Sequence, residues 1–253
     1  MQTLGAADVL KQPADGYTIL SASLPAALAP WLLPAANIRL DVEFTPLIKL
    51  ATVYHVLVVN PSVRANALPE LVALLKRQPD KLTFSSGGFG TPAHVTGELF
   101  KLQTGVRATH VPYQALPQAM GDLINGTNQF QFITPLPVLD LIAAGQLRAL
   151  AVAAPTRSAV LKDVPTVGEA GFLDLISQDW IRLLVRRGTP AEIVNRLNQA
   201  VNRVLAREEL RSAIAKLGAE AAGGSSIQFS EFPTSQMAYW AKVVKDSGMK
   251  MHE

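Results

Sequence analysis

A short β-favouring run in the middle of the chain ends in closely spaced glycines, and a helix is predicted to begin directly after them. The segment reads Leu82-Thr-Phe-Ser-Ser-Gly-Gly-Phe-Gly-Thr-Pro-Ala-His94. Thr91 suits the N-cap, Pro92 suits the first helical position, and apolar residues then recur at helical spacing. A strand, a tight turn and a helix in this order are typical of an α/β fold.

The turn before this helix is also a candidate anion site. The first turn of a helix leaves backbone N–H groups without intrahelical partners, and the helix dipole favours a negative charge there. The amides around Gly88 and Gly90 are therefore candidate donors to a phosphate or a carboxylate. A tight turn that binds nothing explains the same spacing equally well. His94 lies in the first turn, where it either reaches a bound anion or pairs with Glu98.

Strand-like and helix-like runs alternate along the rest of the chain. The predicted strands are Tyr17–Ala22, His55–Val59, Lys81–Ser85, Ala108–Pro112, Gln129–Ile133, Leu147–Val152 and Trp180–Val185, and the predicted helices are Leu68–Arg77, Pro92–Gln103, Leu116–Ile124, 190–207, Glu209–Leu217 and Phe229–Asp246. This rhythm favours mainly parallel sheets with helices on both faces. The apolar run Ile19–Ala36 contains three prolines, so we expect a buried strand and an irregular segment, not a membrane span.

Composition limits the classes of protein to which the chain can belong. Its 253 residues are 49% hydrophobic and 17% charged, which is typical of a globular protein. The net charge of +3 comes without a Lys/Arg stripe between aromatics, so we expect no nucleic-acid partner, although a small acidic ligand would suit it. The absence of cysteine excludes disulfides and a Cys nucleophile. The first residues show no signal peptide.

Motifs for catalysis are missing from the sequence. There is no Gly-x-Ser-x-Gly elbow, no His-Glu-x-x-His and no nucleotide phosphate loop, and the four histidines have no metal-site spacing. The spacing Gly88-x-Gly90-x-x-Ala93 meets a loose dinucleotide fingerprint. A Rossmann unit carries an acidic residue at the end of its next strand, but Ala108-Thr-His-Val-Pro-Tyr-Gln114 has none. We therefore expect no catalytic residue, no metal and no cofactor.

Several motifs, in order along the chain, resemble the Bug solute-binding proteins, which are the extracytoplasmic receptors of bacterial tripartite tricarboxylate transporters. The motifs are Asp15-Gly-Tyr-Thr-Ile-Leu20, Phe44-Thr-Pro46, Val56-Leu-Val-Val-Asn-Pro61, Ser86-Gly-Gly-Phe-Gly90, His94-x-x-Gly-Glu-Leu-Phe100, Thr109-His-Val-Pro-Tyr113, Leu147-Arg-Ala-Leu-Ala-Val152 and Asp163-Val-Pro-Thr-Val-x-Glu-Ala-Gly171. The resemblance implies an α/β, two-lobed periplasmic-binding-protein fold (Venus-flytrap, type II-like), without enzymatic activity, and a small carboxylate ligand in the cleft.

The resemblance also implies which residues contact the ligand. Members of the family hold a ligand carboxylate with backbone amides, hydroxyls and ordered waters from two facing loops. The corresponding residues of this chain are Ser21, Ser23, Ser86, Gly88, Phe89, Gly90, Thr91, His94, Tyr113, Gln114 and Thr134. For Ser21 and Ser23, hydroxyls that bond to their own backbone are an equally good explanation.

The same resemblance predicts the lobes and the kind of ligand. Residues 1–56 and 176–253 are expected to form lobe 1, and residues 57–175 lobe 2, which carries the glycine loop. The family's opening strand, glycine loop and helix are missing from this sequence, so lobe 1 is expected to be N-terminally truncated. Gln129 and Ile133 stand at positions that are typically acidic in the family. Because no carboxylate is then available for a ligand ammonium, a plain carboxylic acid is expected rather than an amino acid.

Taken together, the sequence predicts a periplasmic receptor for a small organic acid, namely a di- or tricarboxylate or an aromatic acid. Its expected partners are the membrane permease subunits of a tripartite transporter. The alternative is a truncated, non-transporting relative with a role in signalling or assembly.

Overall fold

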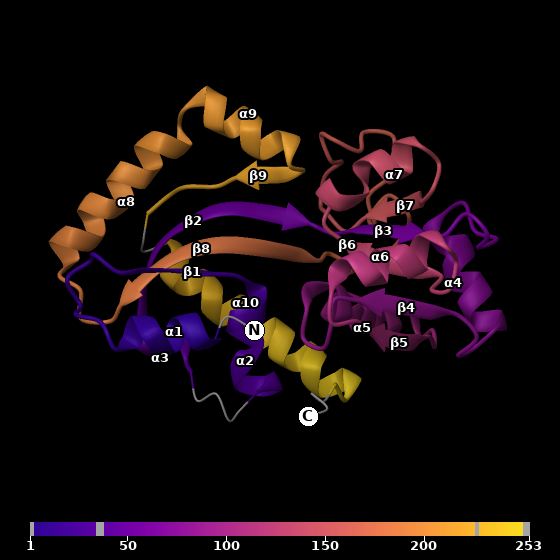
Figure 1. Ribbon diagram of the computed structural model, residues 1–253, viewed down its shortest axis with the longest axis horizontal. Helices are drawn as coiled ribbons and strands as arrows, with labels where there is room; N and C mark the ends of the chain where they lie inside the picture. Colours follow the sequence, from indigo (N-terminus) through magenta and orange to yellow (C-terminus); the bar gives the residue numbers. More distant parts are fainter. Residues whose placement is uncertain (1–2, 34–37, 226–227, 250–253) are drawn as a thin grey trace. The chain divides into compact units, whose positions relative to one another are not determined.

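The chain divides into two compact units, each built around its own sheet (Figure 1). The computed structural model describes residues 3–33, 38–225 and 228–249. The first unit runs to Thr52 and resumes at Asp179, and the second unit is Val53–Gln178. Both divisions fall within strands, so the units are joined by continuous strands and not by a linker of irregular structure.

The first unit contains a four-stranded sheet with the strand order β1-β8-β2-β9. Its elements are α1 (Thr3–Leu10), β1 (Ile19–Ala22), α2 (Leu24–Leu32), α3 (Leu40–Glu43), β2 (Phe44–Tyr54), β8 (Gln178–Arg186), α8 (Ala191–Leu205), α9 (Glu208–Lys216), β9 (Ala219–Ala221) and α10 (Gln228–Ser247). Strand β1 is antiparallel to β8. The apolar faces of α8 and α9 bury Leu47 and Ile48 of β2 and Val185 of β8. Helix α10 packs against α2.

The second unit contains a five-stranded sheet with the order β5-β4-β6-β3-β7. Its elements are β3 (Val56–Val59), α4 (Leu68–Arg77), β4 (Thr83–Ser86), α5 (Pro92–Thr104), β5 (Thr109–Pro112), α6 (Leu116–Ile124), β6 (Phe130–Ile133), the 3₁₀ helix η2 (Leu136–Val138), α7 (Leu139–Ala143) and β7 (Arg148–Val152). Strand β4 is parallel to β5 and β6, and β3 is antiparallel to β6 and β7. The predicted α/β class is confirmed, but the sheets are mixed and not mainly parallel, because β3 and β1 each pair in the antiparallel sense.

Helix α5 packs directly on the parallel part of this sheet. Its Phe100 contacts Phe130 and Phe132 of β6, with ring centroids 6.0 and 5.7 Å apart, and all three side chains are fully buried. Gly97 lies against Phe84 of β4 so closely that a Cβ atom there would come within 2.2 Å of the ring. This close approach holds the start of α5 next to the end of β4, where the glycine loop lies.

Helix α2 replaces the irregular segment predicted after β1, so that part of the expectation for Ile19–Ala36 is wrong. Pro25 lies in the first turn of the helix, where a missing N–H group does no harm. The backbone N–H of Leu24 donates to Oδ1 of Asp179 at 2.9 Å, and the two residues are 155 positions apart. The group that caps this helix is therefore supplied by a distant part of the sequence.

Strand β2 was not predicted either, although it has 11 residues. Its buried positions recur in pairs and do not alternate one by one. Strict alternation is the sequence pattern from which a half-buried strand is predicted, so β2 gives no such pattern. Among the described helices, none combines the length and the apolar character that crossing a membrane requires.

The contact between α5 and β4 gives a testable prediction about stability. Gly97→Ala should lower the free energy of unfolding by about 1–3 kcal/mol, because the new methyl group overlaps the Phe84 ring. Gly121→Ala is the matched control, since Gly121 also lies in a helix and a methyl group added there would meet open space. This control substitution should leave the free energy of unfolding unchanged or raise it by up to about 1 kcal/mol. Denaturant melts of both variants measure the difference, and equal stabilities would contradict the tight contact.

Candidate functional site

The glycine loop between β4 and α5 is folded onto itself by its own polar groups. Thr91 occupies the N-cap position and Pro92 follows in the first turn, as predicted. The Thr91 hydroxyl accepts no N–H group of the helix, and it donates to the carbonyl of Gly88 at 2.7 Å. Gly88 and Gly90 have φ angles of +117° and +69°, which side chains other than glycine rarely adopt. The loop therefore needs glycine at both positions.

The amides of Gly88 and Gly90 are already occupied, so their predicted role as free anion donors is wrong. The Gly88 N–H donates to Oγ of Ser86 at 3.1 Å. The Gly90 N–H donates to Nδ1 of His94, also at 3.1 Å. Both acceptors are side chains of the same strand–loop–helix segment. These two bonds stabilise the loop, and neither amide is available to a ligand while they persist.

Other backbone amides in this segment remain available. Within the described part of the chain, the N–H groups of Ala93 and His94 have no hydrogen-bond acceptor. They are the second and third residues of α5, where unsatisfied donors are expected because Thr91 does not cap them. The Gly87 N–H likewise has no acceptor among the described residues. The free N–H groups of this turn are therefore neighbours of the two that were predicted.

His94 and His110 form a stack beneath the glycine loop. Their ring centroids are 3.9 Å apart, and the Phe89 ring contacts both by its edge at 5.4 Å. His110 Nε2 lies 2.7 Å from Oγ of Ser86. Burial lowers the pKa of His94 to about 4 and the pKa of His110 to about 3, so both rings are neutral at pH 7.

The hydrogen bonds of His94 can be compared with the two roles considered for its side chain, namely contact with a bound anion and pairing with Glu98. Glu98 pairs with Lys101 at 2.9 Å, so the predicted contact between His94 and Glu98 is absent. Instead, Nδ1 of His94 accepts a hydrogen bond from the Gly90 N–H, and the imidazole ring stacks on that of His110. The backbone N–H of His94 has no acceptor among the described residues and lies at the start of α5.

A cavity of about 300 Å³ lies at the start of α5. Its walls come from the glycine loop, the first turn of α5, the start of α6, the end of β6 and the residue before β3. The lining residues are His55, Gly87, Thr91, Pro92, Ala93, Leu116, Gln131, Phe132, Ile133 and Thr134. The described residues of this lining include no Asp or Glu, so none of them sets a fixed negative charge against an anion. The volume is at the lower end of the range for small-molecule sites.

Two polar side chains of the cavity are buried and incompletely bonded. The Nε2 atoms of His55 and Gln131 have no hydrogen-bond partner among the described residues. Oγ of Ser85 donates to Oε1 of Gln131 at 3.1 Å, which leaves the amide NH₂ group of Gln131 available. A buried, unsatisfied polar group costs about 1–3 kcal/mol, which a ligand that bonds to it would recover. The cavity is therefore suited to a polar ligand.

The structure gathers most of the sequence-predicted site residues around this loop and cavity. Thr91 and Thr134 line the cavity, while Ser86, Gly88, Phe89, Gly90 and His94 build the loop beside it. The Tyr113 amide donates to the carbonyl of Ser86 at 2.9 Å, and its hydroxyl bonds to Asp122 and Asn128. Gln114 follows Tyr113 and is exposed.

The two predicted serines belong to the first unit. Ser21 is an exposed residue of β1, paired in register with Leu183 of β8. Ser23 is at the N-cap position of α2, where its carbonyl accepts the Ala26 amide. Each is thus placed at a strand or helix end of that unit.

Sequence reasoning missed His55 and Gln131, which supply the cavity's unpartnered side-chain nitrogens. Both residues belong to runs that are otherwise apolar, His55-Val-Leu-Val-Val59 and Phe130-Gln-Phe-Ile133. A single polar residue in a buried strand requires a partner. That requirement was the available signal, and it would have marked both positions for attention.

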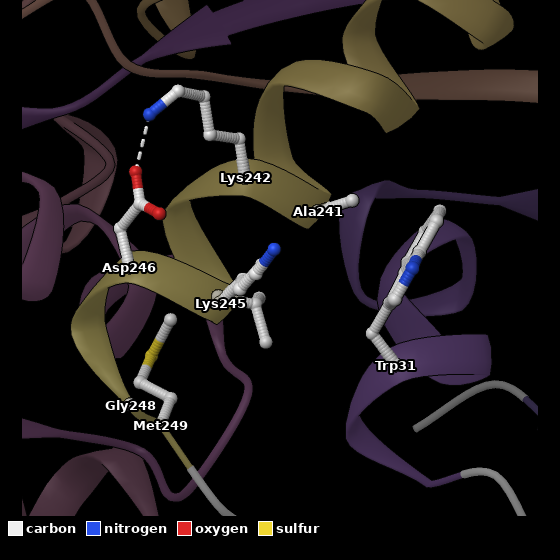
Figure 2. A pocket seen from close by; sticks show the side chains of 8 residues that line it. Trp31, Ala241, Lys242, Lys245, Asp246, Gly248 and Met249 are labelled. Carbon is white, nitrogen blue, oxygen red and sulfur yellow. Dashed lines mark hydrogen bonds and ion pairs between the residues drawn. The ribbon is translucent and has the colours of Figure 1, made fainter.

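A second cavity, of about 680 Å³, lies in the first unit between α2 and α10 (Figure 2). Trp31 of α2 forms one side, and Ala241, Lys245 and Met249 are among the residues on the other. Lys242 is paired with Asp246, and both side chains are exposed. The polar groups of this cavity therefore include surface charges, in contrast to the buried donors of the cavity at α5.

The fold and the cavity together define a solute-binding protein of the periplasmic type. R. palustris Rpa4515 with adipate superposes with a TM-score of 0.87, at 30% sequence identity, over 98% of this chain and 83% of that chain. MatC (Rpa3494) from Rhodopseudomonas palustris with bound malate gives a TM-score of 0.82, at 27% identity, over 96% and 84%.

The sequence comparison names the family. Residues 2–249 match the tripartite tricarboxylate transporter family receptor, and the chain belongs to this family. Protein BugT from Bordetella pertussis is 31% identical over 250 residues, which are 98% of this chain and 77% of BugT. The predicted membership is thus confirmed, and so is the prediction of a receptor that is not an enzyme, because the family and its structural neighbours are solute-binding proteins.

The buried histidine stack predicts how stability depends on pH. An unfolded histidine takes up a proton near pH 6.5, whereas folded His110 stays neutral down to about pH 3. Stability is therefore full above about pH 6.5 and is lost as the pH falls. Because His110 is only partly buried, solvent screening reduces its share of this loss to about 1 kcal/mol or less between pH 6.5 and 5. In His110→Phe, which retains an aromatic ring, the loss over this interval should be smaller by that amount. Urea melts at each pH measure it, and an unchanged pH dependence would refute the assignment.

Proposed function

We propose that the protein is a periplasmic receptor that captures a small organic carboxylate for a tripartite tricarboxylate-type transporter. The observation that carries the proposal is the cavity at the start of α5, which has unpaired N–H donors and an acid-free lining. Membership of the receptor family supports the role. The adipate and malate bound to two structural relatives support a ligand of the dicarboxylate type.

Binding would rely on neutral donors. A carboxylate at the start of α5 would accept the N–H groups of Ala93 and His94, assisted by the helix dipole. The free amide nitrogen of Gln131 would supply a further donor. Hydrogen bonds to an ionised group are roughly twice as strong as bonds between neutral groups. The lining contains neither Lys nor Arg, so the ligand charge would be held by oriented dipoles.

The rest of the ligand would contact the apolar part of the cavity. Leu116, Phe132 and Ile133 offer a surface for a short carbon chain. A ligand ammonium would find no carboxylate in the lining, so an amino acid should bind more weakly than the corresponding plain acid. The proposal therefore covers di- and tricarboxylates and aromatic acids.

The predicted two-lobe mechanism is part of the same proposal. Lobe 1 would comprise residues 1–56 and 176–253, and lobe 2 residues 57–175, with Ser21 and Ser23 of lobe 1 and Gln114 of lobe 2 contributing contacts. Hinge closure of such lobes excludes water and strengthens each hydrogen bond to the ligand.

Calorimetry and thermal shift against a panel of acids test the ligand class. The panel contains adipate, succinate, malate, citrate, benzoate and aspartate. At least one of the plain acids should raise Tm and bind measurably, and aspartate should bind more weakly than succinate. If no acid in the panel changes Tm, the carboxylate-receptor proposal is wrong.

Gln131→Glu tests the position of the ligand. The substitution preserves the shape of the side chain and the acceptor for Ser85, but replaces a donor with a negative charge. We expect Kd for the bound acid to rise about a hundredfold or more, since like charges and a lost donor each cost several-fold to tenfold or more. Gln118→Glu makes the same charge change at an exposed position of α6 and should leave Kd unchanged. Equal affinities of the two variants would place the ligand elsewhere.

The transporter partnership has its own test. Uptake of the radiolabelled acid into membrane vesicles that contain the permease subunits should depend on added receptor. Uptake that does not change on addition of the receptor would contradict this part of the proposal, whatever the binding measurements show.

A further inference from the structure

His55 is held at the start of a chain of directed hydrogen bonds. The Thr96 hydroxyl donates to the carbonyl of Pro92 at 2.7 Å. Because its single proton is used there, Thr96 must accept the bond from Oγ of Ser177, which lies 2.6 Å away. The Ser177 proton is then used in turn, so Ser177 accepts from Nδ1 of His55, at 3.0 Å.

This chain determines the tautomer of the imidazole. Nδ1 carries the proton, and Nε2 of the neutral ring is left with a lone pair. Burial lowers the pKa of His55 to about 4, so the ring is neutral at pH 7. Nε2 is buried and has no partner among the described residues, and the side chain as a whole is 1% exposed. The described part of the chain thus holds a hydrogen-bond acceptor for which it provides no donor.

The acceptor belongs to the cavity that contains the anion donors. His55 is one of its lining residues, together with Ala93 of α5 and Gln131 of β6. Thr96 and Pro92 belong to the first turns of α5, so the chain of hydroxyls holds His55 beside the same helix start. The residues around this cavity thus carry both kinds of group, namely N–H donors that suit a carboxylate and one buried lone pair that does not.

The Nε2 lone pair of His55 favours some chemical groups of a ligand over others. A carboxylate oxygen would be repelled by it, and an alkyl group would leave it unsatisfied. An ammonium group would need a counter-charge, and the lining contains no Asp or Glu. A hydroxyl group satisfies the acceptor and carries no charge. A carboxylic acid with a hydroxyl near its carboxylate therefore matches the complete set of groups.

We propose that His55 determines specificity for a hydroxy acid, by accepting a hydrogen bond from the ligand hydroxyl at Nε2. Ser177 and Thr96 are the positioning residues that set the tautomer. The inference rests on the proposed carboxylate-binding function and narrows its ligand class.

Ligand pairs that differ by one hydroxyl test the inference by calorimetry. L-malate is compared with succinate, and citrate with tricarballylate. In at least one pair the hydroxy acid should bind about tenfold or more tightly than its deoxy partner. Equal affinities within both pairs, or tighter binding of the deoxy acids, would overturn the inference while leaving the receptor function intact. If none of the four acids binds while another acid of the panel does, the inference fails and the receptor function stands; only a null result across the whole panel defeats both.

His55→Phe tests the residue. It retains a planar ring but removes the acceptor, so the affinity for the preferred hydroxy acid should fall to that of its deoxy partner. The affinity for the deoxy acid should fall by a smaller factor, so the ratio of the two affinities is the quantity that tests the role of His55. Ser177→Ala, which removes the partner of Nδ1, should lower the preference for the hydroxy acid in part. An equal loss for both acids in His55→Phe would mean that His55 has a merely structural role.

Nitrogen-15 NMR of the unsubstituted protein tests the tautomer without any variant. The Nε2 resonance of His55 should have the chemical shift of an unprotonated ring nitrogen, and Nδ1 that of a protonated one. Addition of the preferred hydroxy acid should move the Nε2 resonance in the direction expected when a lone pair accepts a hydrogen bond. A protonated Nε2, or a resonance that does not respond to a bound hydroxy acid, would refute the proposal.

Discussion

The close contact between Gly97 of α5 and Phe84 of β4 is the constraint on which the candidate site depends. Only a residue without a Cβ allows the helix to approach the sheet this closely. The approach brings the first turn of α5 to the end of β4, so that the glycine loop has to turn sharply within a few residues. It also places Thr96 where it can bond to Ser177 and, through it, to His55. One packing contact therefore positions both the donors and the acceptor of the cavity.

Some backbone N–H groups of the glycine loop are bonded within the protein, and others nearby have no partner among the described residues. Ser86 and His94 satisfy the amides of Gly88 and Gly90, which keeps the loop in its glycine-dependent conformation. The amides of Gly87, Ala93 and His94 have no acceptor among the described residues. A site whose frame is already bonded loses little conformational entropy when a ligand binds. This preorganisation agrees with a receptor, whose task is affinity and not chemical change.

Much of the second unit could be predicted from local patterns. The helices Leu68–Arg77 and Leu116–Ile124 have the predicted bounds, because each has an extended N-cap residue and a proline as its second residue, and presents a regular apolar face. The first unit was harder to predict. Helix α2 is capped by Asp179 from a distant strand, and β2 lacks the alternation that identifies a half-buried strand. Both errors arise where the stabilising group is far away in the sequence or the burial pattern is irregular.

The sequence by itself determined that a strand, a glycine turn and a helix follow one another at residues 82–104, because backbone conformation and helix starts depend on neighbouring residues. Its family motifs also determined the class of protein. Only the tertiary structure decided which N–H groups of that turn are free and that His55 presents a bare nitrogen. These properties depend on partners such as Ser177, which lies 122 positions from His55. A hydrogen bond between distant residues follows from packing, and no local pattern encodes it.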